Sequence, residues 1–403
     1  MELVIRNIDK IYSSGSKPPL KGISQGKLRI RRGESILVDD GKIVSVGKDV
    51  SAGKGAERID ASGMIAIPGF VDSHTHMVYG GDRAEEFELR AKGVTYLELL
   101  QSGNGILKTW RDTRDMGSLD LFIETSRRLE MHLRNGITSM EMKSGYGFSR
   151  DSEQRMLQVI ERLESAYKIR ISRTLLPLHA MPPDKNREEY IQESMDMLSE
   201  FKGEYDFTDV FCDKGAFTVK ESEAYFSKAS ELGIPLRLHA DEIEDIGATE
   251  LCSKFPFRSV DHLLHTSERG MELVRRSGAV ATFLPATSFS LGEKYAEGRK
   301  WISKGVPVVL ASDHSPLNPI SSMQFVGNLA MRFCKLTAEE SLNAMTCNAA
   351  YSLDLHKNIG SIEEGMEADM VFYKTSDLRD IFYKWDMLKP SLVIRGGDVQ
   401  DFS

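Results

Sequence analysis

The sequence predicts an α/β fold: a (β/α)₈ TIM-like barrel with a small β-sandwich domain formed by the N- and C-terminal segments. Short apolar runs alternate with amphipathic helical segments through the middle of the chain, whereas both ends carry short alternating runs. The length of 403 residues is ample for one large barrel and a smaller companion.

The middle of the chain contains eight strand-like runs, which are Met64–Val71, Ile137–Met142, Ile171–Leu178, Phe207–Cys212, Pro235–Leu238, Ser259–Leu263, Val280–Leu284 and Pro307–Ala311. Apolar positions at helical spacing lie between them, in Leu119–Arg134, Ser152–Ala166, Glu189–Phe201, Glu221–Leu232 and Glu268–Ser277. This alternation is typical of a parallel barrel, whose active site forms where the strands end. A doubly wound open sheet is the alternative, but no glycine-rich nucleotide loop follows the first strand.

Short runs of alternating apolar and polar residues predict strands at both ends of the chain, at Leu3–Ile5, Ser35–Val38, Lys42–Val46, Ala368–Phe372 and Ser391–Asp398. The pair Asp40-Gly41 indicates a hairpin, because glycine tolerates a positive φ. The segment Lys10–Gly26 is rich in Ser, Pro, Gly and Lys and predicts an exposed loop. We expect residues 1–65 and 356–403 to form the small domain and residues 66–355 to form the barrel.

Composition excludes several classes of function. The formal net charge of −8 comes from scattered residues without a long basic run, so we expect no nucleic-acid partner. No apolar run is long enough to span a bilayer and the first residues lack a signal-peptide core, so we expect no membrane association. The four cysteines have no paired spacing, which indicates reduced thiols and a cytoplasmic protein.

The strongest local signal for chemistry is the segment Pro68–His76, which ends in His-Thr-His. His74 and His76 are two residues apart on a strand, so both imidazoles project to the same side and can meet one metal ion. A lone His-x-His is equally compatible with two polar residues at a strand end. Its place at the end of the first predicted barrel strand favours the metal site.

Other strand ends add candidate ligands. His239 ends the fifth strand, Glu242 follows three residues later, and Asp313 ends the eighth strand. A helix-start carboxylate and an N-cap are the structural alternatives for the two acids. Six of the nine histidines fall at predicted strand ends, which together favours a metal site on the catalytic face: His74, His76, His179, His239, His262 and His314.

The sequence resembles the amidohydrolase superfamily, and within it the imidazolonepropionase family, over nearly the whole chain. The most specific segments are Pro68–His76, Gly80–Phe87, Lys143–Gly147, His239–Glu242 and Phe283–Pro285. The resemblance implies one divalent ion, Zn²⁺ or Fe²⁺, held by His74, His76, His239 and Asp313. It further implies substrate contacts by Arg83, Tyr146 and His179, with Glu242 and His262 near the reacting atoms.

One loop departs from the family pattern. After the last ligand the family usually has Asn-Pro-Gly followed by Ser or Thr, whereas this chain has Ser315-Pro316-Leu317-Asn318. We expect Ser315 to donate a hydrogen bond to the substrate and Asn318 to replace the hydroxyl residue. The segment Ser102–Ile106 also replaces one glycine of a commoner Gly-Gly-Gly run. Both changes concern substrate recognition and leave the metal chemistry intact.

The implied reaction opens the cyclic amide of 4-imidazolone-5-propanoate with a metal-activated water and yields N-formimidoyl-L-glutamate. Glu242 and Asp313 would move the proton to the leaving nitrogen, and His262 would hold the carbonyl oxygen. Arg83 would pair with the propanoate, because its planar guanidinium matches a carboxylate. A structural ion pair with Glu85 or Glu86 is the alternative role for this arginine.

Three other interpretations stay open at this point. A mononuclear deaminase acting on cytosine or guanine would share the ligand set, although a neutral base needs no carboxylate-binding arginine. A scaffold protein without a metal would be expected to lose ligands that this chain keeps. Lys214 near the end of the fourth strand could be carbamylated and bridge a second metal ion, which Asp213-Lys214-Gly215 does not favour. The resemblance also implies a possible homodimer.

Overall fold

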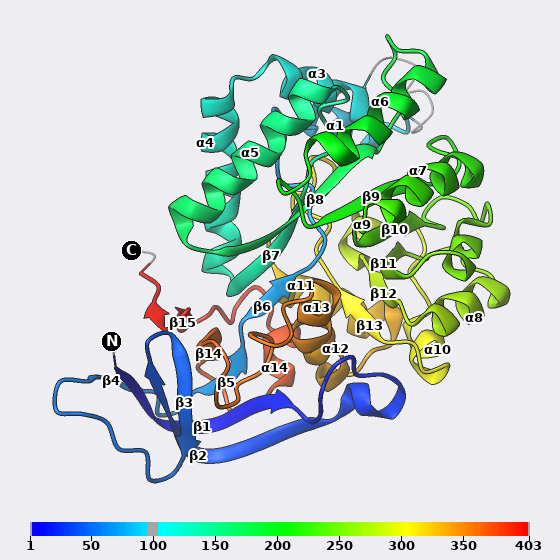
Figure 1. The fold of residues 1–403 in the computed structure, drawn as a ribbon. Coiled ribbons are helices and arrows are strands. Elements are labelled where there is room, and N and C mark those ends of the chain that lie inside the picture. The colour runs from blue at the N-terminus through cyan, green and yellow to red at the C-terminus, as the bar shows by residue number, and fades with distance from the viewer. Residues whose placement is uncertain (1, 95–103, 402–403) are drawn as a thin grey trace.

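The computed structural model describes residues 2–94 and 104–401, and two sheets dominate it (Figure 1). The larger sheet has eight parallel strands that neighbour one another in chain order. They are β6 (Phe70–Asp72), β7 (Ile137–Lys143), β8 (Arg170–Leu178), β9 (Phe207–Cys212), β10 (Leu236–Ala240), β11 (Phe257–His262), β12 (Val280–Phe283) and β13 (Val308–Leu310). The predicted barrel is confirmed.

The barrel closes between its first and last strands, just beyond their carboxyl ends. Thr75 and His314 form a parallel bridge. The His76 amide donates to the His314 carbonyl at 2.8 Å, and the Asp313 amide donates to the His74 carbonyl at 3.0 Å. The predicted ligands of both strands therefore belong to the backbone that closes the barrel, so their relative positions are set by sheet hydrogen bonds.

Helices cover the outside of the barrel (Figure 1), namely α4 (Ser118–Arg134), α5 (Arg150–Tyr167), α6 (Arg187–Glu200), α7 (Val219–Glu231), α8 (Glu268–Ser277) and α10 (Gly298–Ser303). Several begin at side-chain caps. Asn186 accepts from two amides at the start of α6, and Thr218 forms a capping box with Glu221 at the start of α7. Within the described ranges, none of the helices combines the length and the apolar character that a bilayer span requires.

Shorter helices surround the ends of the barrel. The helices α1 (Ala84–Ala91) and α3 (Ile106–Asp115) lie in the connection from β6 to β7, and α9 (Pro285–Leu291) follows β12. The 3₁₀ segment Ala248–Ser253 lies between β10 and β11 and packs against α8. The remaining helices lie between the barrel and the second sheet or beside it (Figure 1), and they are α11 (Met323–Leu329), α12 (Ala338–Met345), α13 (Cys347–Ser352) and α14 (Arg379–Tyr383).

The second sheet joins the two ends of the chain (Figure 1). Its strands are β1 (Leu3–Ser14), β2 (Leu28–Asp39), β3 (Lys42–Gly47), β4 (Glu57–Asp60), β5 (Ile65–Pro68), β14 (Met370–Tyr373), β15 (Leu392–Arg395) and β16 (Asp398–Val399). The hydrogen bonds unite these strands in one sheet over a shared apolar core that includes Ile5, Ile36, Met370 and Ile394. The Asp40-Gly41 hairpin is confirmed, with φ of 47° and 76°.

Two local predictions were wrong. The expected loop Lys10–Gly26 begins as strand, because Ile11 and Tyr12 are buried and β1 continues to pair with β2 up to Ser14. The expected barrel strand Met64–Val71 is divided between β5 and β6 at Gly69. A Cβ at Gly69 would lie 2.2 Å from the Thr138 hydroxyl oxygen, so this crossing needs a glycine. The exact division into domains at residues 65, 66, 355 and 356 stays a prediction.

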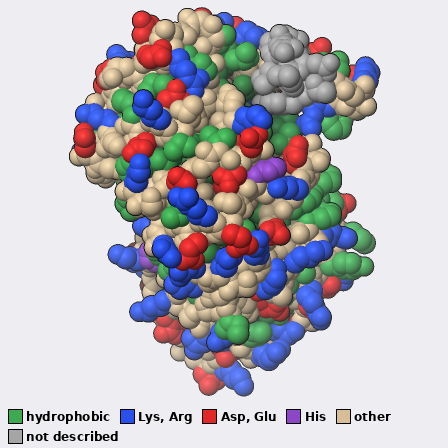
Figure 2. Space-filling view, turned by 90° about the vertical axis from the view of Figure 1, so that its right-hand side faces the viewer, with side chains coloured by type: hydrophobic (Ala, Val, Ile, Leu, Met, Phe, Trp, Pro, Cys, Tyr) green, Lys and Arg blue, Asp and Glu red, His purple; other side chains and the backbone are tan. Residues whose placement is uncertain are grey.

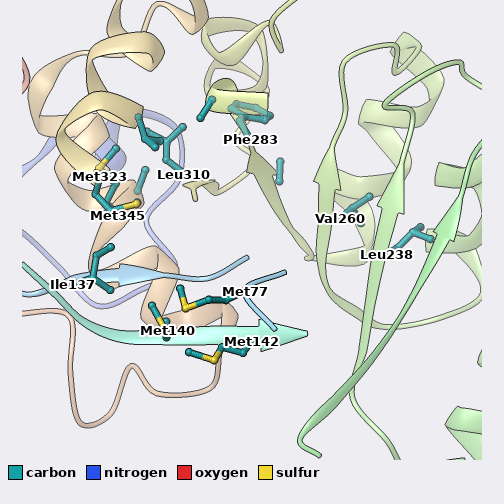
Figure 3. Close-up of a cluster of buried hydrophobic side chains, with 14 of the residues drawn as sticks. Met77, Ile137, Met140, Met142, Leu238, Val260, Phe283, Leu310, Met323 and Met345 are labelled. Atoms are coloured by element: carbon teal, nitrogen blue, oxygen red, sulfur yellow. The ribbon is translucent and has the colours of Figure 1, made fainter. Parts of the chain in front are cut away.

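Alternate residues of β7 face two different environments, the apolar layer between the strands and the helices and the charged interior of the barrel. Met140 and Met142 lie in the apolar cluster between strands and helices, beside Ile137 and Met77 (Figure 3). The alternate residues Glu141 and Lys143 are fully buried on the other side of the strand, inside the barrel. The surface, by contrast, intersperses basic and acidic side chains on the face shown in Figure 2.

Candidate metal centre and substrate cavity

Four side chains from three strand ends converge inside the mouth of the barrel. The Nε2 atom of His76 lies 3.3 Å from Nε2 of His74 and 3.3 Å from Nε2 of His239. Asp313 Oδ1 lies 3.6 Å and 3.5 Å from the Nε2 atoms of His74 and His76. The structure therefore brings together all four predicted ligands, although more than two hundred residues separate His74 from Asp313 in the chain.

The protonation of these groups fits a cation. Burial lowers the pKa of His74 and of His76 well below the usual range, so both imidazoles are neutral. Nδ1 of His74 donates to Asp261 Oδ2 at 2.7 Å, and Nδ1 of His239 lies 3.0 Å from Asp209 Oδ2. These contacts leave the Nε2 atoms of His74 and His239 to face the centre, where each lies 3.3 Å from His76 Nε2. Such an electron-rich set is suited to one divalent cation.

Glu242 and His262 lie beside this centre. Glu242 follows β10, and its Oε2 atom is 3.5 Å from His262 Nε2 at the end of β11. Burial, reinforced by the charge of Asp313, raises the pKa of Glu242 well above its usual range. Burial also raises the pKa of Asp313 to about 6, against the hydrogen bond from the Thr287 hydroxyl. Glu242, beside the centre, can thus hold a proton near neutral pH.

The backbone at these strand ends is strained. Asp241, His262, Leu263 and Asp313 have φ of 55°, 76°, 62° and 52°, in the left-handed region that residues with a Cβ rarely adopt. Each conformation turns the chain sharply as it leaves a barrel strand. Strain of this kind persists where the surrounding structure enforces it and concentrates at functional sites.

The centre forms the floor of a cavity of about 410 Å³. Its lining includes His76, Arg83, Tyr146, His179, His239, Glu242, His262, Asp313 and Ser315. Arg83, at the start of α1, donates from Nε to the Thr109 hydroxyl at 3.0 Å, and its nearest Glu86 oxygen is 3.9 Å away. The ring of His179 stacks on His76 with centroids 4.7 Å apart and planes at 16°. A cation, a phenol and imidazoles therefore face one enclosed space above the four converging side chains.

A model described as the amidohydrolase family matches residues 65–399. The chain belongs to the amidohydrolase family. Curated relatives narrow the family further. A protein of Thermoplasma volcanium named imidazolonepropionase is 37% identical over 395 residues, covering 98% of this chain and 97% of the relative. One of Caldanaerobacter subterraneus with the same name is 37% identical over 406 residues, covering 99% and 98%. Within the amidohydrolases, the chain is a member of the imidazolonepropionase family.

Solved structures of other amidohydrolase-type proteins have the same fold at low identity. An atrazine chlorohydrolase from Arthrobacter aurescens, described as complexed with zinc, matches with a TM-score of 0.73 and 19% identity, covering 98% of this chain and 94% of that one. E. coli guanine deaminase matches with a TM-score of 0.74 and 16% identity, covering 100% and 99%. At these identities the likeness concerns the fold alone.

The family segment Lys143–Gly147 presents Tyr146 to the cavity through a loop held by Glu153 on α5. Glu153 Oε1 accepts from the amides of Gly147 and Phe148 at 2.7 and 3.0 Å, and Oε2 accepts from the Gly145 amide at 2.8 Å. His179 Nδ1 donates to the Gly145 carbonyl at 2.9 Å. One buried carboxylate therefore shapes the loop around Tyr146, and the same loop orients His179.

In the loop 315–318, which departs from the family pattern, the two candidate substrate-binding residues Ser315 and Asn318 lie in different places. Ser315 lines the cavity together with Leu317. Asn318 is fully buried behind them, where Nδ2 donates to the Ser312 and Asp313 carbonyls at 2.8 and 3.1 Å. Its Oδ1 accepts from the Ser290 hydroxyl at 2.8 Å. The structure therefore places Asn318 outside the cavity lining, where its amide supports the Asp313 backbone.

Two further residues singled out in the sequence lie away from the centre. His314 points to the far side of the strand end, where its ring packs edge-on against His132 at 4.7 Å. The expectation that all six strand-end histidines face the site is therefore wrong for His314, whose Nδ1 atom instead lies 3.1 Å from the Ile320 carbonyl. Lys214 has a side chain that is 64% exposed and paired with Glu244, outside the cavity. In the segment Ser102–Ile106, which lacks one glycine of the commoner run, residues 102 and 103 lie outside the described residues.

A network of buried charges, which was not predicted from the sequence, lies beneath the four candidate ligands. Lys143 Nζ contacts Glu141 Oε1 at 2.6 Å and Asp209 Oδ2 at 2.8 Å. Arg237 donates from Nη2 to the Ser73 carbonyl at 2.8 Å and lies 3.4 Å from Asp261 Oδ2.

The network keeps the acceptors of the histidines charged. Burial disfavours the Lys143 charge, but Asp209 and Glu141 together raise the pKa of this lysine. The available sequence signal was a charged residue between apolar ones in each strand, such as Met140-Glu141-Met142 and Leu236-Arg237-Leu238. Period-two alternation places such residues inside the barrel.

Proposed function

We propose that this protein hydrolyses the cyclic amide of 4-imidazolone-5-propanoate to N-formimidoyl-L-glutamate. The observation that carries the proposal is that Arg83 lines the same cavity as three of the four converging side chains, His76, His239 and Asp313. A guanidinium suits the substrate's carboxylate, and the neutral ring of cytosine or guanine would leave it without a partner. The names of the curated relatives support the same reaction.

We assign His74, His76, His239 and Asp313 to hold one divalent cation. Three imidazole nitrogens and one carboxylate oxygen suit Zn²⁺ or Fe²⁺. When bound, such a cation acts as a Lewis acid and lowers the pKa of a water molecule from ~15.7 to about 7. Metal analysis of the purified protein distinguishes zinc from iron.

The chain's own residues then handle the proton and the developing charge. Glu242 and Asp313 take the proton of the attacking water and deliver it to the ring nitrogen as the carbon–nitrogen bond breaks. The raised pKa of Glu242 suits this exchange near neutral pH. His262, 3.5 Å from Glu242, holds the carbonyl oxygen as it becomes negative.

The remaining cavity residues position the substrate. Arg83 binds the propanoate, and Tyr146 and His179 border the ring from the side of the Lys143–Gly147 loop. Ser315 is placed to donate a hydrogen bond from the cavity wall, whereas Asn318 acts from behind by holding the Asp313 backbone. The described cysteines are free and buried, which supports a cytoplasmic location. Assembly as a homodimer and the absence of a nucleic-acid partner stay predictions.

Turnover of 4-imidazolone-5-propanoate by the metal-loaded chain tests the proposal. We expect the imidazolone absorbance to fall and N-formimidoyl-L-glutamate to accumulate, without ammonia. Release of ammonia from cytosine or guanine, with no turnover of the imidazolone, would replace this function by that of a deaminase. Protein that neither contains nor takes up a divalent metal would instead indicate a scaffold.

A further inference from the structure

Asp213 is a buried carboxylate that follows β9 and reaches the loop after β10. Its side chain accepts four backbone amides: Oδ2 accepts from Glu242 at 2.7 Å and from Ile243 at 3.0 Å. Oδ1 accepts from Glu244 at 3.0 Å and from Lys214 at 2.7 Å. The residue is only 2% exposed, so these bonds are shielded from solvent.

The loop that Asp213 holds is the one that presents Glu242. It leaves β10 through Asp241, whose φ of 55° is unfavourable for a residue with a Cβ. Three successive amides, of residues 242 to 244, then point at a single carboxylate. These amides and the strained turn need a compensating acceptor, and Asp213 supplies it.

We propose that Asp213 is a positioning residue that fixes the Glu242 side chain at the reacting centre through this loop. The inference rests on the proposed function only in giving Glu242 its proton-transfer role. A carboxylate is required because its two oxygens serve four donors. The isosteric amide offers one oxygen and turns an NH₂ group toward backbone N–H groups, so it cannot replace the aspartate.

A second contact joins the same two loops and provides a matched control. Lys214 pairs with Glu244 at the surface, with side chains 64% and 54% exposed. Exposed pairs of this kind contribute little to stability. Replacing Lys214 removes this link without touching the buried acceptor, so the two variants separate loop anchoring by Asp213 from general loop contact.

The test compares Asp213→Asn with Lys214→Met in the full, metal-loaded chain. For Asp213→Asn we expect kcat to fall roughly 100-fold, the effect of a displacement of about 1 Å in a catalytic group, with metal content unchanged. Amide hydrogen exchange at residues 242 to 244 should accelerate at least ~10-fold, as expected for loss of a buried hydrogen bond. Lys214→Met should change neither quantity.

A double-mutant cycle of Asp213→Asn and Glu242→Gln tests whether Asp213 affects activity through Glu242. We expect Asp213→Asn to cost little further activity in the Glu242→Gln background, because the group it positions is already gone. Equal losses in both backgrounds, or unchanged exchange at residues 242 to 244, would overturn the proposal.

Hydrogen exchange in the unmodified chain needs no variant and no turnover. The amides of residues 242 to 244 should exchange as slowly as those of β10, and fast exchange there would also overturn the proposal. This measurement separates the failure of the Asp213 anchor from the failure of the proposed reaction. It also decides the case if Asp213→Asn does not fold.

Discussion

Asp261 Oδ2 lies 2.7 Å from His74 Nδ1 and thereby fixes which imidazole nitrogen faces the metal centre. We expect Asp261→Asn to lower the affinity for a divalent cation about 10–100-fold, because the weaker acceptor orients and polarises the imidazole less. Competition with a chelator of known affinity measures this change. Asp196→Asn on the outer helix α6 is the control, and equal affinities of both variants would contradict the role of Asp261.

Arg83 should act mainly on substrate binding. We expect Arg83→Met to raise KM for the imidazolone propanoate about 10–100-fold, the range for loss of a charge-assisted hydrogen bond, with a smaller effect on kcat. Steady-state kinetics with a ring analogue that lacks the carboxylate provide the control. Arg83→Met should leave its inhibition constant unchanged, and a parallel loss for both ligands would show that the variant disturbs the cavity itself.

Lys143 is the one cation within 3 Å of both Glu141 and Asp209 among the described ion pairs. Lys143→Met leaves two buried carboxylates without this partner, so we expect the free energy of unfolding to fall by about 3–5 kcal/mol. Urea denaturation measures the loss. Lys92→Met, which breaks an exposed pair with Glu88, should cost no more than about 1 kcal/mol. A similar small loss for Lys143→Met would refute the role of the network in stability.

Asp369 makes stability depend on pH. Burial raises its pKa from 3.8 to about 6, against the hydrogen bond from the Gly396 amide. Between about pH 4 and pH 6 the folded state therefore binds more protons than the unfolded state. The contribution of Asp369 to the free energy of unfolding is accordingly complete below about pH 4. It is lost as the pH rises through 6.

The isosteric variant Asp369→Asn isolates this effect. Because the amide does not titrate, the variant should gain stability relative to the natural chain as the pH rises from 4 to 7, on the order of 2 kcal/mol. Unfolding free energies of both proteins across this range give the measurement. Parallel curves would show that Asp369 does not titrate in the folded state as described.

Glu153 should influence the substrate through the Tyr146 loop. Glu153→Gln keeps one acceptor oxygen where three amides need bonds, so the loop from Gly145 to Phe148 loses part of its anchoring. We expect KM to rise about tenfold and metal content to stay unchanged, as measured by kinetics and metal analysis. The neighbouring Gln154→Ala is the control. Loss of metal from Glu153→Gln would point to wider damage of the barrel.

Local sequence patterns were sufficient for much of the architecture. The helical segments beginning near Leu119, Ser152 and Glu189 coincide with α4, α5 and α6, because amphipathic spacing and capping residues are local properties. The Asp40-Gly41 hairpin follows from backbone preferences alone. The composition of Lys10–Ser14 predicted a loop, but the structure has a strand there. Burial of Ile11 and Tyr12 in the second sheet outweighs the preference of the polar residues around them for a loop.

By itself, the sequence determined the alternation of strands and helices and the residue types at each strand end, since those depend on neighbours within a few positions. Only the tertiary structure decided which of these side chains meet. Strand register places Asp261 beside His74 and Lys143 beside Asp209. Closure of the barrel places Asp313 beside His76, while His314 points away from the metal centre toward His132. These pairings join residues far apart in the chain, and their partners are chosen by hydrogen bonding between strands, which no local pattern encodes.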